Sequence, residues 1–153
     1  MKQEVWYNSG SVSSGNLPAK KVDFDTIEKR FGIKLPNVLV ELFRIQNGGR
    51  TSFKTYTLPD NEFLELEDFV TLKEIGEECD FGFEKDDWNR LIRRTSKLIV
   101  IARHGYDTFL CLDYRSSTDE PSVTLIDAVL EPKEKVHYAT FQSFIEHLQQ
   151  ETT

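Results

Sequence analysis

Residues 98–114 have the sequence LIVIARHGYDTFLCLDY, in which two apolar runs flank a glycine-centred turn. Residues 98–102 are apolar without interruption and too few for a helix, a pattern typical of a strand covered on both faces. After the turn Gly105-Tyr106-Asp107, residues 108–114 repeat the strand signature. Because short turns of this kind join neighbouring antiparallel strands, the stretch predicts a hairpin inside an antiparallel sheet.

Two more strands and a helix are predicted on the C-terminal side of this hairpin. Residues 122–126 and 135–139 contain β-branched and aromatic side chains, and each run follows a proline-containing turn. Thr140 is a typical N-cap. The apolar residues behind it recur at helical spacing: Phe141, Phe144, Ile145 and Leu148. Four consecutive strands predict a meander, with the closing helix packed on it.

Helices are predicted on the N-terminal side. Asp25 and Glu28 have the spacing of a capping box, and Gly32 provides a left-handed C-cap. Leu35-Pro36 begins a second amphipathic helix, which ends at Asn47-Gly48-Gly49. Three more elements follow: strands over residues 51–58 and 63–66, and a helix from the Thr71–Glu74 capping box to about residue 78.

This order of elements is typical of the α+β class. We expect a single domain with a mainly antiparallel central sheet of about five to six strands, flanked by helices. A chain of 153 residues is long enough to bury a core without disulfides or metal. Residues 1–22 are predicted to be an irregular N-terminal segment and residues 23–150 the folded domain.

Composition excludes several functional classes. The chain has 26 acidic and 19 basic side chains, a net charge of −7, and a negative surface repels phosphate backbones; nucleic acid is therefore not expected as a direct ligand. No apolar run approaches the roughly 18–20 residues of a membrane span, and the N-terminus lacks the apolar core of a signal peptide. We therefore expect a cytoplasmic protein that does not bind membranes. Cys79 and Cys111 form no C-x-x-C unit and are predicted to be reduced thiols.

The negative charge is concentrated in residues 60–90. This stretch, here called the acidic segment, has twelve acidic and three basic side chains, a net charge of −9, whereas residues 1–59 carry +4 and residues 91–153 carry −2. It is either a solvated face or a surface that attracts a basic protein. Trp88 and Trp6 are each either core residues or aromatic anchors of an interface. The candidate partner-binding residues are Glu65, Glu67, Asp68, Glu77, Glu78, Asp80, Glu84, Asp86, Asp87 and Trp88.

Catalytic motifs are missing from the sequence. It has no G-x-S-x-G elbow, no P-loop and no H-E-x-x-H helix. His104, His137 and His147 share no metal-ligand spacing with another His or Cys. Asp80-Phe81-Gly82 matches the kinase tripeptide without the other kinase motifs, and the acidic segment lacks the order of a calcium loop. We expect a protein that is not an enzyme and holds no cofactor or metal.

Several of these motifs, taken in order, resemble the SUKH superfamily, which includes the yeast cell-wall-assembly regulators of the Smi/Knr type. The resemblance spans roughly residues 23–148. It implies an α+β fold in which the shared motifs have structural roles and no catalytic ones. The residues that carry it are Leu35, Pro36, Asn47, Gly48, Gly49, Gly105, Asp107, Leu112 and Asp113.

The resemblance also implies a function. Bacterial members of the superfamily resemble immunity proteins, which bind and neutralise polymorphic toxins, often nucleases. Combined with the charge of residues 60–90, this favours an immunity protein whose partner is a basic toxin domain, bound by direct contact. The alternative is a regulatory scaffold of the Smi/Knr type, which binds host proteins.

Overall fold

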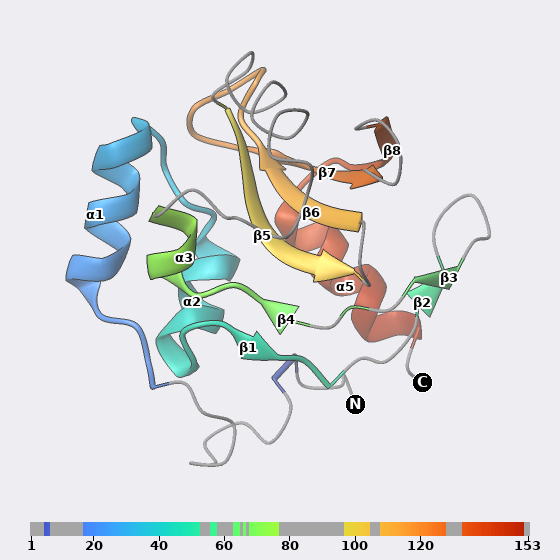
Figure 1. Ribbon diagram of the computed structural model, residues 1–153, viewed down its shortest axis with the longest axis horizontal. Helices are drawn as coiled ribbons and strands as arrows, with labels where there is room; N and C mark the ends of the chain where they lie inside the picture. Colours follow the sequence, from blue (N-terminus) through green and yellow to red (C-terminus); the bar gives the residue numbers. More distant parts are fainter. Residues whose placement is uncertain are drawn as a thin grey trace.

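The predicted hairpin is present in the computed structural model as β5 (Leu98–His104) and β6 (Thr108–Asp113). The strands β7 (Ser122–Asp127) and β8 (Lys133–Tyr138) follow in sequence order, each antiparallel to the one before (Figure 1), which confirms the meander. β8 begins two residues earlier than the sequence indicates. The structure describes the following residues: 5–6, 17–52, 56–57, 63–64, 66, 68–76, 97–104, 108–127 and 133–151.

Two short strands that the sequence does not predict extend the sheet beyond β5. The strand β4 (Asp68–Phe69) pairs with β5, and β1 (Gly49–Arg50) pairs with β4, which gives a six-stranded antiparallel sheet of order β1-β4-β5-β6-β7-β8. The α+β prediction is therefore confirmed. The strands expected over residues 51–58 and 63–66 correspond to a small separate hairpin of β2 (Tyr56–Thr57) and β3 (Phe63–Leu64).

The central strand β6 is covered on both faces, as its sequence predicts, since all six of its residues are buried. Leu110 and Leu112 belong to the core shared with the helices. Phe109 and Cys111 occupy the alternate positions, which face the other side of the sheet. Cys111 is a free, buried thiol, and Cys79 lies outside the described residues.

Four helices complete the described fold: α1 (Lys21–Phe31), α2 (Asn37–Ile45), α3 (Leu72–Gly76) and α5 (Phe141–Glu151). In Figure 1, α5 lies behind β5 and β6, α2 lies behind α3, and α1 packs against α3. Two predicted caps are confirmed. Thr140 Oγ1 accepts the Ser143 N–H at 3.0 Å, and Thr71 and Glu74 exchange two hydrogen bonds of 3.1 Å. Within the described ranges, no helix has the length and apolar character needed to cross a bilayer.

The capping box predicted at Asp25 and Glu28 is wrong. The helix α1 begins earlier, at Lys21, where the N–H of Lys20 donates to the Asp23 carboxylate at 2.8 Å. Asp25 instead pairs with Lys21 at 2.8 Å, and Glu28 accepts the N–H of Leu35 at 2.9 Å. Spacing alone does not distinguish a box at Lys20 from one at Asp25, because an acidic residue follows three positions later in both cases.

Trp6 lies in the core, so its interpretation as an interface anchor is wrong. Its side chain is 3% exposed, and its ring meets those of Phe43 and Phe69 edge-on at centroid distances of 5.6 Å. The indole N–H donates to the carbonyl of Leu42 at 2.9 Å, which satisfies the buried polar atom. The neighbouring Val5 carbonyl accepts the Ser52 N–H at 2.8 Å. Part of the expected irregular segment is thus fixed to α2 and β1.

Candidate functional site

Most of the residues predicted to bind a partner lie outside the described part of the chain. Asp68 is the exception. It lies half-buried in β4, and its Cα is paired in register with those of Arg50 and Arg103 on the two flanking strands. Arg50, directly opposite Asp68 on β1, carries the opposite charge, which is a favourable cross-strand pair. The other candidates, outside the described residues, are Glu65, Glu67, Glu77, Glu78, Asp80, Glu84, Asp86, Asp87 and Trp88.

The motif Asn47-Gly48-Gly49 leads from α2 into β1 and contacts the start of α3. The Asn47 side-chain oxygen accepts the N–H of Leu72 at 2.9 Å, so it caps the first turn of α3 from a distant part of the chain. Gly48 has φ +74°, and its Cα lies so close to the Val70 backbone that a Cβ there would be 2.6 Å from the Val70 oxygen. The motif is therefore a packing junction more than the flexible turn its glycines suggest.

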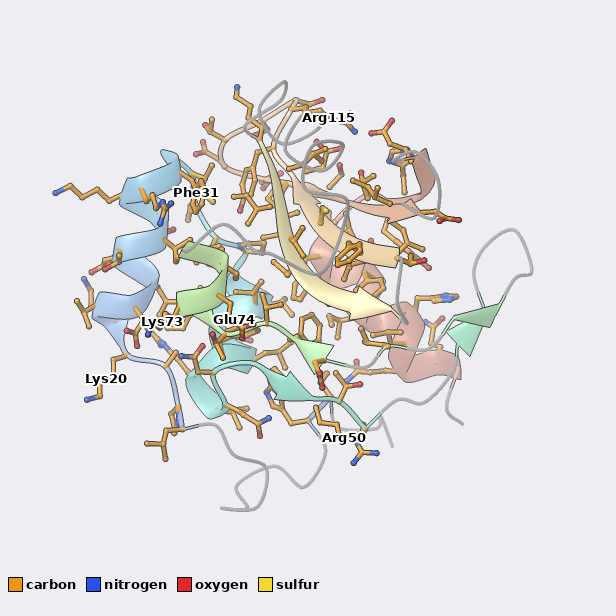
Figure 2. The ribbon with its side chains drawn as sticks, in the orientation of Figure 1. Lys20, Phe31, Arg50, Lys73, Glu74 and Arg115 are labelled. Atoms are coloured by element: carbon orange, nitrogen blue, oxygen red, sulfur yellow. The ribbon has the colours of Figure 1, made fainter. Side chains whose placement is uncertain are left out.

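The motif residue Asp113 is the centre of a polar network at the end of β6. It is 8% exposed and accepts two bonds from the Arg115 side chain, at 2.9 and 2.6 Å, and one from the Thr124 hydroxyl at 2.9 Å. Arg115 also contacts Glu134 of β8. Figure 2 shows Arg115 at the end of the molecule opposite Arg50. The network therefore ties the turn after β6 to β7 and β8.

The same network orients the ring of His137. Thr124 Oγ1 lies 3.0 Å from His137 Nδ1. Since Thr124 gives its only hydrogen to the Asp113 carboxylate, Nδ1 must carry a proton and donate it to the hydroxyl oxygen. His137 is exposed on β8 and stands at the end of this chain of hydrogen bonds. Among the described residues, no group of three or more His, Cys, Asp or Glu side chains could hold a metal ion.

Because of Asp113, the free energy of unfolding is expected to decrease at acid pH. Burial raises the pKa of this carboxyl, but the hydrogen bonds from Arg115 and Thr124 outweigh burial and hold the pKa below its ordinary value of 3.8. A lowered native pKa adds stability above the unfolded pKa, and this stability is lost as the pH falls through the native pKa. We expect Asp113→Asn to cost about 1–3 kcal/mol at pH 7, because charged hydrogen bonds are lost.

Urea denaturation at several pH values measures this effect. The free energies of unfolding of the wild type and of Asp113→Asn should converge between about pH 5 and pH 2, because the wild-type carboxylate takes up a proton there. Asp119→Asn, at an exposed carboxylate, is the matched control and should change stability by less than about 0.5 kcal/mol. A pH-independent difference between Asp113→Asn and wild type would contradict this role.

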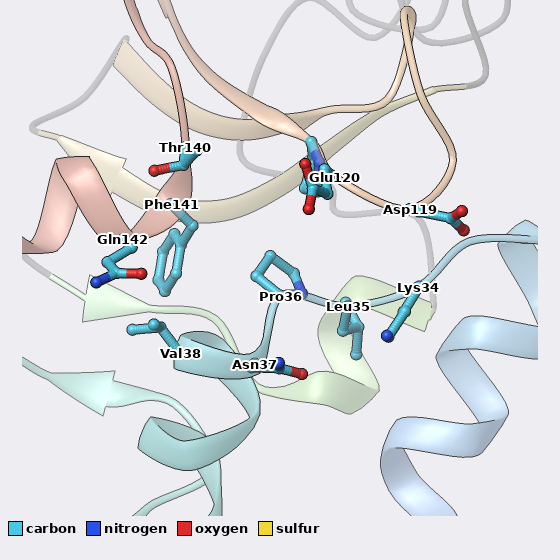
Figure 3. A pocket seen from close by; sticks show the side chains of 11 residues that line it. Lys34, Leu35, Pro36, Asn37, Val38, Asp119, Glu120, Thr140, Phe141 and Gln142 are labelled. Carbon is cyan, nitrogen blue, oxygen red and sulfur yellow. The ribbon is translucent and has the colours of Figure 1, made fainter.

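A groove of about 510 Å³ lies on the surface where three distant segments meet (Figure 3). Its walls are residues 34–38, which lead into α2, residues 119–121 in the turn between β6 and β7, and residues 140–142 at the start of α5. The floor is apolar and includes Pro36 and Phe141. The rim consists of exposed polar side chains: Lys34, Asn37, Asp119, Glu120, Thr140 and Gln142.

Hydrogen bonds to backbone groups join the first two of these walls. The Lys34 N–H donates to the Thr118 carbonyl at 2.9 Å, and the Tyr114 hydroxyl donates to the Lys34 carbonyl at 2.7 Å. Burial raises the pKa of Tyr114, which keeps its hydroxyl protonated as a donor. Ser117 Oγ accepts the backbone N–H groups of residues 119 and 120, both at 3.2 Å. The groove is therefore formed in advance of any binding.

The chemistry of the groove suits binding. Leu35 and Phe141 are 2% and 1% exposed, while Pro36 and Val38 are half-buried and leave apolar surface at the base. An apolar centre with a polar rim is the usual anatomy of a protein interface. The lining contains no His or Cys, and its one hydroxyl, that of Thr140, already accepts a bond as a helix cap.

The sheet, helices and groove define a single-domain α+β protein with a preformed surface cavity. The chain belongs to the SMI1/KNR4 family (SUKH-1), whose model matches residues 18–149. The match begins just before α1 and ends within α5, and it confirms the resemblance inferred from the motifs. No curated protein matches the chain significantly.

The structure also places the motif residues and identifies groove residues that sequence patterns missed. Leu35 and Pro36 line the groove, Leu112 is in the core, and Gly105 and Asp107 lie outside the described residues. Residues 119–121 and 140–142 carried only turn and cap signals in the sequence. Nothing local links them to residue 35, since the groove arises from contacts between segments far apart in the chain.

Proposed function

We propose that this protein is a cytoplasmic, non-catalytic immunity protein that neutralises a basic toxin domain by direct contact through residues 60–90. The observation that carries the proposal is the net charge of −9 in this 31-residue stretch of a chain with a total charge of −7. A toxin that acts on nucleic acid needs a basic face for phosphate groups. An acidic surface is drawn to such a face and occupies it, and complementary charge mainly raises the association rate.

Family membership supports this proposal. The shared motif residues that the structure describes lie in the core, at the α2–α3 junction, in the groove and in the network around Asp113. They have structural roles, and all of them lie outside the acidic segment. Two elements of the acidic segment, β4 and α3, are fixed in the fold, because β4 pairs on both sides and Asn47 caps α3. Asp68 of β4 is thus held by the sheet and loses little entropy on binding.

The test is binding to the toxin domain encoded beside the gene of this protein. We expect Glu77→Lys/Glu78→Lys and Asp86→Lys/Asp87→Lys each to slow association by about tenfold or more at low salt, with the wild-type rate falling steeply as salt rises. Asp25→Lys/Glu41→Lys makes the same charge change at exposed acids elsewhere and is the matched control. Growth rescue of toxin-producing cells provides a second readout.

Four results would overturn the proposal. Binding that does not depend on salt would contradict the electrostatic contact. So would equal effects of the charge-reversal pairs in the acidic segment and of the control pair. A toxin that binds no variant and is not neutralised by the wild type would remove the immunity function. Capture of several host proteins, none of them toxic when expressed alone, would favour the regulatory scaffold instead.

A further inference from the structure

We propose that the groove between residues 34–38, 119–121 and 140–142 receives an extended segment of the partner protein in which an apolar side chain neighbours a lysine or arginine. This rests on the proposed function, because the partner is the same toxin. It adds a second contact, made by a different part of the chain from the acidic segment.

The apolar part of this segment is specified by the groove floor. Pro36 and Val38 are half-buried and lie beside the buried ring of Phe141, as Figure 3 shows for the labelled side chains. The exposed parts of Pro36 and Val38 stay wetted when the groove is empty, and covering them with a leucine-sized side chain removes apolar area from water. The volume of about 510 Å³ falls within the range of sites that take a small ligand or a few side chains.

The basic part is specified by two neighbouring carboxylates. Asp119 and Glu120 are exposed at one rim, and the structure shows no ion pair of either side chain with another described residue. Their backbone N–H groups are held by Ser117, so both residues are carried by a fixed turn, although their side chains point in different directions (Figure 3). Lys34 lies beside this turn, since its N–H donates to the Thr118 carbonyl, and the three charged side chains of the lining sum to −1. The lining therefore favours one basic side chain near the β6–β7 turn.

Nuclear magnetic resonance of the isotope-labelled full chain tests this groove directly. The probes are three blocked peptides: acetyl-Gly-Ser-Leu-Arg-Leu-Ser-Gly-amide, the same peptide with Glu in place of Arg, and the same peptide with Gly in place of both Leu residues. We expect the first to bind saturably with a Kd on the order of 1 mM or tighter, moving the amide signals of Asn37, Val38, Phe141 and Gln142. The other two should bind at least about fivefold more weakly.

A variant without the two rim carboxylates tests whether they cause the preference for the Arg peptide. Asp119→Asn/Glu120→Gln should bind the Arg and Glu peptides about equally, while Asp25→Asn/Glu41→Gln should keep the wild-type preference. The inference is overturned if the Arg peptide does not saturate by about 10 mM, if signals move elsewhere on the protein, or if the Glu peptide binds as well in the wild type.

Toxin-binding measurements on variants test the groove contact separately from the proposed function. Asp119→Lys/Glu120→Lys should speed toxin dissociation by about tenfold or more, because it repels the basic residue held in the groove. Unchanged toxin binding by this variant would overturn the groove contact and leave the acidic segment as the binding site. Loss of binding in this variant, with no effect of Glu77→Lys/Glu78→Lys, would overturn the proposed site and support the groove.

Discussion

We expect Trp6→Ala to lower the free energy of unfolding by about 3–5 kcal/mol, the range typical of removing a large aromatic side chain from a core. Trp6 is 3% exposed and packs edge-on against Phe43 of α2 and Phe69 of β4. The substitution leaves a cavity between two fixed elements, which can close it only partly. Urea denaturation followed by circular dichroism measures the loss.

Two further variants test whether the loss comes from the buried ring of Trp6. Trp6→Phe keeps an aromatic ring but loses the indole N–H, and we expect a smaller loss of about 1–2 kcal/mol. The Leu42 carbonyl is not left unpaired, because it also accepts the Gln46 N–H at 3.2 Å. Leu17→Ala, at a side chain that is 83% exposed, should change stability by less than about 0.5 kcal/mol. A loss below about 1 kcal/mol for Trp6→Ala would contradict the core position of Trp6.

Gly48→Ala should cost about 2–5 kcal/mol, for two independent reasons. A residue with a Cβ pays about 1–2 kcal/mol to adopt the left-handed backbone of Gly48, whose φ is +74°. The new Cβ would also stand 2.6 Å from the carbonyl oxygen of Val70, a backbone atom that cannot rotate away. Relieving this overlap costs about 1–3 kcal/mol more. Thermal and urea unfolding both report the loss.

Gly32→Ala is the matched control for this substitution. Gly32 has nearly the same backbone, with φ +63°, but no atom lies within 4 Å of the position its Cβ would take. Only the conformational cost of about 1–2 kcal/mol should therefore appear. The difference between the two variants isolates the contact between Gly48 and Val70, and equal losses would contradict the close packing of the α2–α3 junction.

The central strands and the closing helix were predictable because their signals are local. The apolar run of residues 98–102 and the alternation through β7 specify strands by period and length alone. Thr140 caps α5 through Ser143, a contact that spans three residues. The strand β4 was not predictable, because it consists of only two residues and Asp68 within it resembles the surrounding acidic surface.

The two candidate sites, the acidic segment and the groove, also differ in whether the sequence reveals them. The acidic segment is a property of composition and is visible in the sequence, whereas the groove is not. Its walls come from segments of the chain about 80 residues apart, as the bond from Tyr114 to Lys34 illustrates. Sequence patterns identified Leu35 and Pro36 as motif residues, but nothing local showed that Asp119 and Glu120 lie beside them.

The sequence by itself determined the α+β class, the order of the strands in the meander, the family and the place of the surplus charge. Only the tertiary structure decided that Trp6 is a core residue, that Asn47 caps a helix 25 residues away, and that Pro36, Glu120 and Phe141 share one groove. The reason is physical. Backbone sterics and side-chain period act over a few residues, but contacts between distant segments depend on strand register, and a shift of one residue would turn each side chain to the other face.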